Sequence, residues 1–443
     1  MTSVESAIPD RIEAHAESET DDADWRSVAS EAVEETAHIT LPVKWESSRQ
    51  VISREIANAR DLRDMSFSPN VSDDSGDLTP MGKIVSVATL ATTGDSVLRE
   101  VVLESEPDAN LVAKYTNDCS QKLMEPWGGD LHPLVSEYAF LMVTNATGIT
   151  PNVYYLSPET QLVSDLSPKS KSSVLSEHAS DCLDKHASLR FMVIDKVGVS
   201  IEDYLGWLRA NRPGDSARDY LLAVLRFGKE SIRLIWQLHE MGLLHGDIHG
   251  KNIMLKKPKG TMAEYDWKND DLVLIDLGFA RFFPAEIGTV ELRGYMPGLN
   301  LFFLSPWHIR GNRIGRRDDL YRVLEMMASL LSDGKLDEGI IAIYKRAHRN
   351  LIEKGNPFDK HKLQADVLYN YKTSCNLFLF DNNLRSSTCE NMGLRLDEKK
   401  TVQKKLEKMK NDILAIDSVD SIPQYGDFIS EIESIERSIT PGR

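Results

Sequence analysis

Short runs of apolar, β-branched residues recur along the chain beyond residue 80, and these runs predict strands. Two runs between Ile84 and Leu103 are separated by a turn around Gly94 and Asp95, a pattern that indicates a β-hairpin. Three further strands are predicted at 111–115, 153–156 and 190–195.

Between and after these strands, apolar residues recur at helical spacing and predict helices. The segment HPLVSEYAFLMV predicts a helix with Leu134, Tyr138 and Leu141 on one face. A long amphipathic helix is expected at Tyr220–Met241, ended by Gly242. Two short strands are expected at 253–255 and 272–275, with helices through most of the remainder. A small sheet with one helix, followed by a helical region, predicts an α+β fold.

The C-terminal region contains one more amphipathic pattern, at Asp397–Ile416. It has two interpretations, a partner-binding helix or a helix packed on the rest of the chain, and we expect the packed helix. Arg437–Arg443 is expected to fray. The apolar stripe of the Asp397–Ile416 helix consists of Val402, Leu406, Met409 and Ile413.

Composition narrows the class of protein. The net charge is −16, and residues 1–40 hold 11 Asp and Glu against only Arg11 and Arg26, so this segment is expected to be disordered. No basic stripe indicates nucleic-acid binding, and no apolar stretch is long enough for a membrane span. The four cysteines are scattered without a CxxC pair, which argues against a disulfide framework or zinc site. Without a secretory signal pattern, a cytoplasmic location is expected, unless a signal peptide has been removed.

The segment LHGDIHGKNIML carries the candidate chemistry. Asp247 and Asn252 lie five residues apart after the long predicted helix, and Asp276 follows an apolar strand in VLIDLGFAR. Each residue alone could be an ordinary turn residue. Together they suit phosphoryl transfer from ATP, in which Asp247 would orient an acceptor hydroxyl and Asn252 and Asp276 would supply oxygen ligands for Mg²⁺.

These segments resemble the catalytic loop and the DFG motif of eukaryotic-type protein kinases, with Leu277 in place of the Phe. RFMVIDKVGVSIEDYL and GRRDDLYRVLEMM are similar to the casein kinase I and vaccinia-related kinase branch, over about Ile84–Leu331. The resemblance implies a bilobal fold and a serine/threonine-protein kinase that uses ATP and magnesium. It also implies that Asp319 accepts backbone hydrogen bonds from the catalytic loop.

The same resemblance assigns the remaining site residues. Lys114 in LVAKY matches the lysine that holds the ATP phosphates, and Glu137 matches its ion-pair partner; otherwise both are surface charges. Ala113 and Met254 would lie on either side of the adenine, Ile194 would gate the pocket, and Asp195–Val197 would be the hinge. The alternative for these residues is plain core packing.

The chain departs from the kinase pattern in three places. Gly94 stands alone where a glycine-rich loop would cover the phosphates, which resembles the parasite kinases that lack this loop. Gly246 replaces an arginine that pairs with an activation-segment phosphate, so activity without phosphorylation of Phe279–Phe303 is expected. His249 replaces a lysine and would either touch the γ-phosphate or simply hydrogen-bond within the loop. The hydroxyls available in or near that segment are Thr289, Tyr295 and Ser305.

Two alternative functions remain open. The HGDxHxxN form also occurs in kinases of small-molecule alcohols, and the poor glycine loop leaves room for a pseudokinase scaffold. The expected organisation is a disordered segment 1–40, an extension 41–80, an N-lobe 81–197 with a surface insert at 157–188, a C-lobe 198–436, and a tail 437–443. The partner is expected to be a protein substrate, and the oligomeric state stays open.

Overall fold

The computed structural model describes the chain from residue 70 to residue 440, with gaps. Segment 1–40, the insert 157–188, Gly94, Thr289 and Tyr295 lie outside the described residues. The described ranges are 70–72, 78–80, 84–92, 96–103, 108–117, 133–145, 147–156, 189–211, 216–282, 304–310, 312–332, 343, 345–352, 360–374, 396–419 and 421–440.

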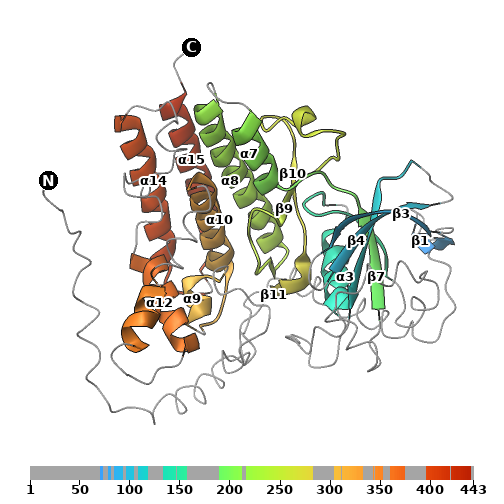
Figure 1. Ribbon diagram of the computed structural model, residues 1–443, viewed down its shortest axis with the longest axis horizontal. Coiled ribbons are helices and arrows are strands. Elements are labelled where there is room, and N and C mark those ends of the chain that lie inside the picture. The colour runs from blue at the N-terminus through green and yellow to red at the C-terminus, as the bar shows by residue number, and fades with distance from the viewer. Residues whose placement is uncertain are drawn as a thin grey trace, which may run out of the picture.

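A five-stranded antiparallel sheet forms one end of the molecule (Figure 1). Its strand order is β3-β4-β5-β7-β6, so the predicted hairpin and all three further strands are confirmed. Helix α3 (Pro133–Thr144) packs against the sheet and buries Leu134 and Leu141. The strands are β3 (Ile84–Thr92), β4 (Ser96–Leu103), β5 (Leu111–Asn117), β6 (Val153–Leu156) and β7 (Leu189–Asp195). A separate two-stranded ribbon consists of β1 (Asn70–Ser72) and β2 (Leu78–Pro80).

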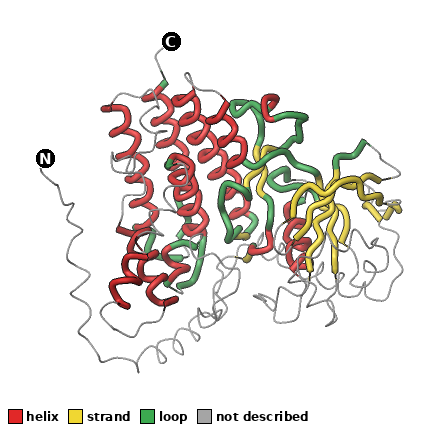
Figure 2. The backbone as a smooth tube through the Cα atoms, in the orientation of Figure 1, coloured by secondary structure: helices red, strands yellow, loops and turns green. Residues whose placement is uncertain are grey.

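Helices form the other end of the molecule (Figures 1 and 2). The longest ends at Glu240 because Gly242, with φ of 78°, adopts the left-handed conformation that terminates helices. The labelled helices of this part are α7 (Ile201–Asn211), α8 (Ser216–Glu240), α9 (Pro306–Ile309), α10 (Arg316–Leu331), α12 (Lys360–Ser374), α14 (Leu396–Leu414) and α15 (Tyr425–Ile439). This mixed structure of small sheets and many helices agrees with the expected α+β class.

Short strands between these two parts hold the candidate chemical residues. Ribbon β9–β10 places the loop 245–252 beside the turn that carries Asp276, because the two strands pair antiparallel from Ile253 to Leu274. The elements involved are β8 (Leu243–Leu244), β9 (Ile253–Leu255), η5 (Met262–Glu264), β10 (Leu272–Leu274), η6 (Leu277–Phe279) and β11 (Arg281–Phe282), with β11 paired to β8.

The core of the helical part is built around α8 and α10. The apolar stripe of α14 is fully buried in this core, so that stripe packs within the chain and is not an exposed face for a partner. Helix α15 continues to Ile439, past the point where fraying was expected, because Ile439 buries its side chain. None of the helices in the described part of the chain combines the length and apolar character needed to cross a membrane.

Candidate functional site

Three residues from distant parts of the sequence meet at one amine. Lys114 on β5 donates from Nζ to both carboxylate oxygens of Glu137 on α3, at 2.9 and 2.8 Å, and to Oδ1 of Asp276 at 2.9 Å. Residues 114 and 276 are 162 positions apart. The structure therefore brings the predicted lysine, glutamate and acidic residue after β10 together in one cluster.

The charges in this cluster stabilise one another. Burial alone would lower the pKa of the Lys114 ammonium, but the carboxylates of Asp276 and Glu137 outweigh it and raise that pKa above its ordinary value. The positive charge of Lys114 is also the main reason that the pKa of Asp276 is lowered. Burial raises the pKa of Glu137, and Lys114 opposes that change. Lys114 and Asp276 are consequently charged at neutral pH.

Asp276 adopts a backbone conformation that costs free energy. Its φ of 61° and ψ of 65° lie in the left-handed region, and among the described residues it is the only non-glycine residue with positive φ. Such a conformation costs about 1–2 kcal/mol for an L-residue and persists where surrounding contacts enforce it. Lys114 provides such a contact through its hydrogen bond to Asp276 Oδ1, and the next residue, Leu277, is fully buried.

The loop 245–252 carries the second group of predicted residues. Asn252 Nδ2 donates to the backbone oxygen of Asp247 at 2.9 Å and to its Oδ2 at 3.0 Å. His249 Nε2 lies 3.4 Å from the same Oδ2, and His249 Nδ1 accepts from the Lys251 amide at 3.2 Å. His249 therefore hydrogen-bonds within the loop, as the second of its two interpretations anticipated.

Asp247 is ionised at neutral pH. Burial would raise the pKa of its carboxyl, but the hydrogen bond from His249 and the positive charge of Arg322 lower the pKa below its ordinary value. A carboxylate in this state can accept a proton from a hydroxyl that is bound next to it.

His245 joins the loop to the Asp276 turn. Its Nε2 lies 3.0 Å from the carbonyl oxygen of Ile275 and must donate to it, so the ring is protonated at Nε2. Nδ1 then accepts from the Asp247 amide at 3.3 Å. One buried imidazole thus fixes the backbone on either side of the site, a role that the sequence analysis did not assign.

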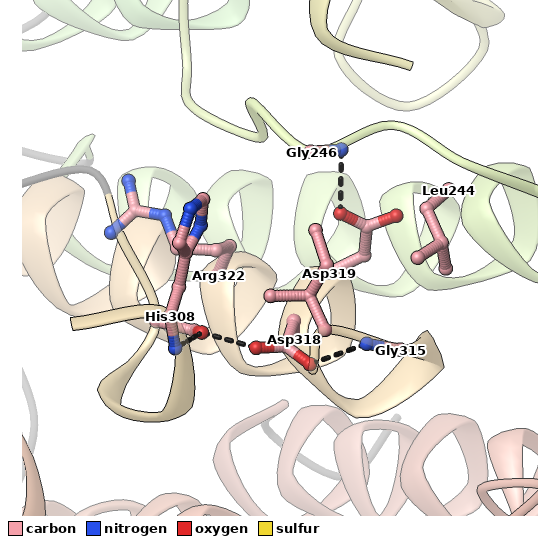
Figure 3. Close-up of a pocket in the computed structure, with 9 residues that line it drawn as sticks. Leu244, Gly246, His308, Gly315, Asp318, Asp319 and Arg322 are labelled. Atoms are coloured by element: carbon pink, nitrogen blue, oxygen red, sulfur yellow. Dashed lines mark hydrogen bonds between the residues drawn. The ribbon is translucent and has the colours of Figure 1, made fainter. Parts of the chain in front are cut away.

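Asp319 on α10 holds the beginning of the loop. Its Oδ2 accepts from the His245 amide at 2.7 Å and its Oδ1 from the Gly246 amide at 2.9 Å, so the backbone contacts that the family resemblance implied are present. Figure 3 shows the second of these hydrogen bonds. His239 Nε2 on α8 also reaches Oδ2, at 2.9 Å. The other nitrogen of His239 lies 2.5 Å from the hydroxyl of Tyr425 on α15. The C-terminal helix is therefore connected to the loop through two buried side chains.

Gly246 cannot be replaced by a larger residue without a shift of the backbone. Its φ is 79°, and a Cβ placed there would lie 2.7 Å from the backbone oxygen of Phe279. Below it, a cavity of about 10 Å³, the size of one water molecule, lies between the loop and α10 (Figure 3). Gly246 is thus required by the path of the backbone, and its lack of a side chain is a structural necessity in this chain.

The residues predicted around the adenine belong to two strands of the sheet and to strand β9. Ala113 on β5 is fully buried and Ile194 on β7 is half-buried, both within the sheet. Met254 on β9 is half-buried and forms an isolated bridge with Ser200. These positions satisfy core packing, and their contact with a nucleotide stays a prediction.

The Asp195 side chain is held on the side of the segment 148–152. Its carboxylate accepts from the Asn152 amide at 2.9 Å and the Tyr154 hydroxyl at 2.6 Å, and its amide donates to Asn152 O at 3.0 Å. Asp195 and Val197 line a cavity of about 250 Å³ with Asn152 and Lys256, among others. Any hinge role for this segment therefore belongs to its backbone and not to the Asp195 carboxylate.

Ser305 differs from its sequence interpretation. It was expected to be an available hydroxyl, but its side chain is buried, caps α9 by accepting from the His308 amide, and hydrogen-bonds to Asp318. The expectation is wrong for Ser305 because Asp318, from the start of α10, packs over it. Gly94, Thr289 and Tyr295 are outside the described residues.

No protein-family model matches the chain, and no curated protein matches it. Within the described residues, no group of three or more His, Cys, Asp and Glu side chains could hold a metal ion. Asp276 and Asn252 still fit Mg²⁺, because this ion takes one or two protein oxygen ligands and completes its shell with water and phosphate.

Proposed function

We propose that this protein is an ATP- and Mg²⁺-dependent protein kinase that phosphorylates serine and threonine hydroxyls. In this proposal the sheet with α3 is the N-lobe, the helical part is the C-lobe, and the site lies between them. The observation that carries it is the convergence of Lys114, Glu137 and Asp276, next to a loop that presents an ionised Asp247.

Each residue has a defined task in this proposal. Lys114, held by the two hydrogen bonds that it donates to Glu137, would bind the α- and β-phosphates as a fixed positive charge. Asp276 and Asn252 would hold Mg²⁺, which neutralises charge on the phosphates when bound. Asn252 Nδ2 is engaged by Asp247, which leaves the amide oxygen of Asn252 as the ligand atom.

Asp247 would orient the acceptor hydroxyl and take its proton. Both of its side-chain contacts, to Asn252 and His249, use Oδ2, so we assign Oδ1 to the hydroxyl. Bringing the hydroxyl and the γ-phosphate together in this fixed geometry is the main contribution that a protein makes to phosphoryl transfer. Because Gly246 leaves no arginine to pair with an activation-segment phosphate, activity is expected without phosphorylation of that segment.

The test is transfer of labelled phosphate from ATP with Mg²⁺ by the wild type and Asp247→Asn. Casein, myelin basic protein and the chain itself serve as protein acceptors, beside a panel of small alcohols and aminoglycosides. Asp271→Asn, at an exposed carboxylate just before β10, is the matched control. Protein labelling that Asp247→Asn abolishes, while nucleotide binding persists, supports the proposal.

Other results would replace the proposal with one of its alternatives. Labelling confined to the alcohols would make the protein a small-molecule kinase. Absence of both transfer and nucleotide binding would make it a pseudokinase scaffold. Undiminished protein labelling by Asp247→Asn would refute the role assigned to Asp247 and leave the rest of the proposal standing.

A further inference from the structure

A buried arginine on α10 touches the loop directly beyond Asp247. Arg322 donates from Nη2 to the carbonyl oxygen of Ile248 at 3.2 Å. Asp319, one helical turn earlier, accepts from the amides of His245 and Gly246. Helix α10 therefore hydrogen-bonds to the loop on both sides of Asp247, through the Asp319 carboxylate before Asp247 and the Arg322 guanidinium after it.

Arg322 is itself held by a chain of buried charges. Its Nη1 pairs with Glu325, and the other carboxylate oxygen of Glu325 pairs with Lys372 on α12. Lys372 is completely buried, and its backbone oxygen accepts from the Tyr321 hydroxyl at 2.9 Å. Ion pairs this deep in the protein are poor stabilisers, because desolvation offsets their attraction. Their presence next to the site therefore suggests a role other than stability.

The loop itself could not supply this cation. The Gly246 position, one residue before Asp247, has no space for a cationic side chain. Helix α10 thus supplies a positive charge that the loop itself cannot carry there.

We propose that Arg322 is a positioning residue for Asp247. It fixes the Ile248 carbonyl, and with it the backbone directly after Asp247, while Glu325 and Lys372 hold the guanidinium in place. This inference rests on the proposed function, since Asp247 must act as the base for its position to affect catalysis.

Three substitutions test this role. Arg322→Met removes the donor to the Ile248 carbonyl, and we expect kcat to fall roughly 10- to 100-fold with KM for ATP nearly unchanged, the cost of a slightly misplaced catalytic group. Arg322→Lys and Arg322→Gln each keep a donor and should recover part of the lost kcat.

The ion pair that holds Arg322 gives a second test. Glu325→Gln removes the carboxylate that fixes the guanidinium, so kcat should fall with KM for ATP nearly unchanged. Arg310→Met is the matched control, because Arg310 lies on the surface and pairs with Asp366. Loss of stability alone would not lower kcat at unchanged KM in variants that are assayed fully folded.

A folded Arg322→Met with kcat within about twofold of the wild type overturns the inference. If Arg322→Met does not fold, kcat of Glu325→Gln decides it in the same way. If the wild type transfers no phosphate, the proposed function fails by itself. The inference is then tested by NMR of the backbone amides of residues 246–249, whose signals must shift in Arg322→Met and not in Arg310→Met.

Discussion

The substitution Gly246→Ala tests the geometry of the site, because it adds a single methyl group at a position with no space for one. In Gly246→Ala the new Cβ would lie 2.7 Å from Phe279 O, and the residue would have to keep a φ of 79°. The left-handed conformation costs an L-residue about 1–2 kcal/mol. The overlap with a backbone atom adds about 1–3 kcal/mol, as for other overpacked positions. We therefore expect the free energy of unfolding to fall by about 2–5 kcal/mol.

Urea unfolding followed by circular dichroism measures this loss, with Gly206→Ala as the control. Gly206 lies inside α7, and a Cβ built there meets nothing within 4 Å. Alanine at such a helical position should stabilise by about 0.5–1 kcal/mol. The same chemical change is therefore expected to have opposite signs at the two glycines.

The reasoning fails if Gly246→Ala lowers the free energy of unfolding by less than about 0.5 kcal/mol. It also fails if both variants change stability by the same amount and sign, since the effect would then be a general property of glycine. Because Asp247 follows directly, the displaced backbone should in addition reduce phosphoryl transfer at temperatures where Gly246→Ala is fully folded.

Three further predictions follow from buried polar groups. Lys114→Met leaves the buried Glu137 carboxylate without its cation, so urea unfolding should show a loss of about 3–5 kcal/mol, which added Glu137→Gln partly recovers. Tyr425→Phe removes the hydrogen bond to His239, and the same assay should show a loss of about 1–2 kcal/mol. Burial raises the pKa of Asp318 from 3.8 to about 7, so its contribution to stability is complete below pH 4 and is lost as the pH rises to 7. Asp318→Asn should flatten that dependence, which urea unfolding at pH 4.5 and pH 8 would detect.

Local patterns were sufficient to predict the strands of the five-stranded sheet and the helices α3, α8 and α14. The hairpin β3–β4 joins two short β-branched runs that are neighbours in sequence, and Gly242 ends α8 through its own backbone conformation. The α14 stripe was also predictable, because residues three and four apart share one helix face. The predicted site residues Lys114 and Glu137 are in contact, as the family resemblance implied.

Contacts between distant segments were not predictable in the same way. Ser305 has the local pattern of an exposed helix cap, and only the packing of Asp318 buries it. His239 and Arg322 look like ordinary polar positions of amphipathic helices, yet they face the loop because α8 and α10 cross beside it. The direction in which a polar helical residue points depends on tertiary packing, which periodicity does not contain.

At Gly246 the sequence resemblance and the tertiary structure lead to opposite expectations. By the family resemblance, Gly246 stands at the position of a protein-kinase arginine, and Gly246→Arg would then leave the loop intact and add a phosphate-binding cation. By structure, any side chain at 246 collides with the Phe279 carbonyl and pulls the Gly246 amide from Asp319. We therefore expect Gly246→Arg to lower both stability and phosphoryl transfer, at least as far as Gly246→Ala. Wild-type stability with unchanged or increased transfer in Gly246→Arg would mean that the loop can follow the ordinary kinase path, and that the glycine is a lost arginine after all.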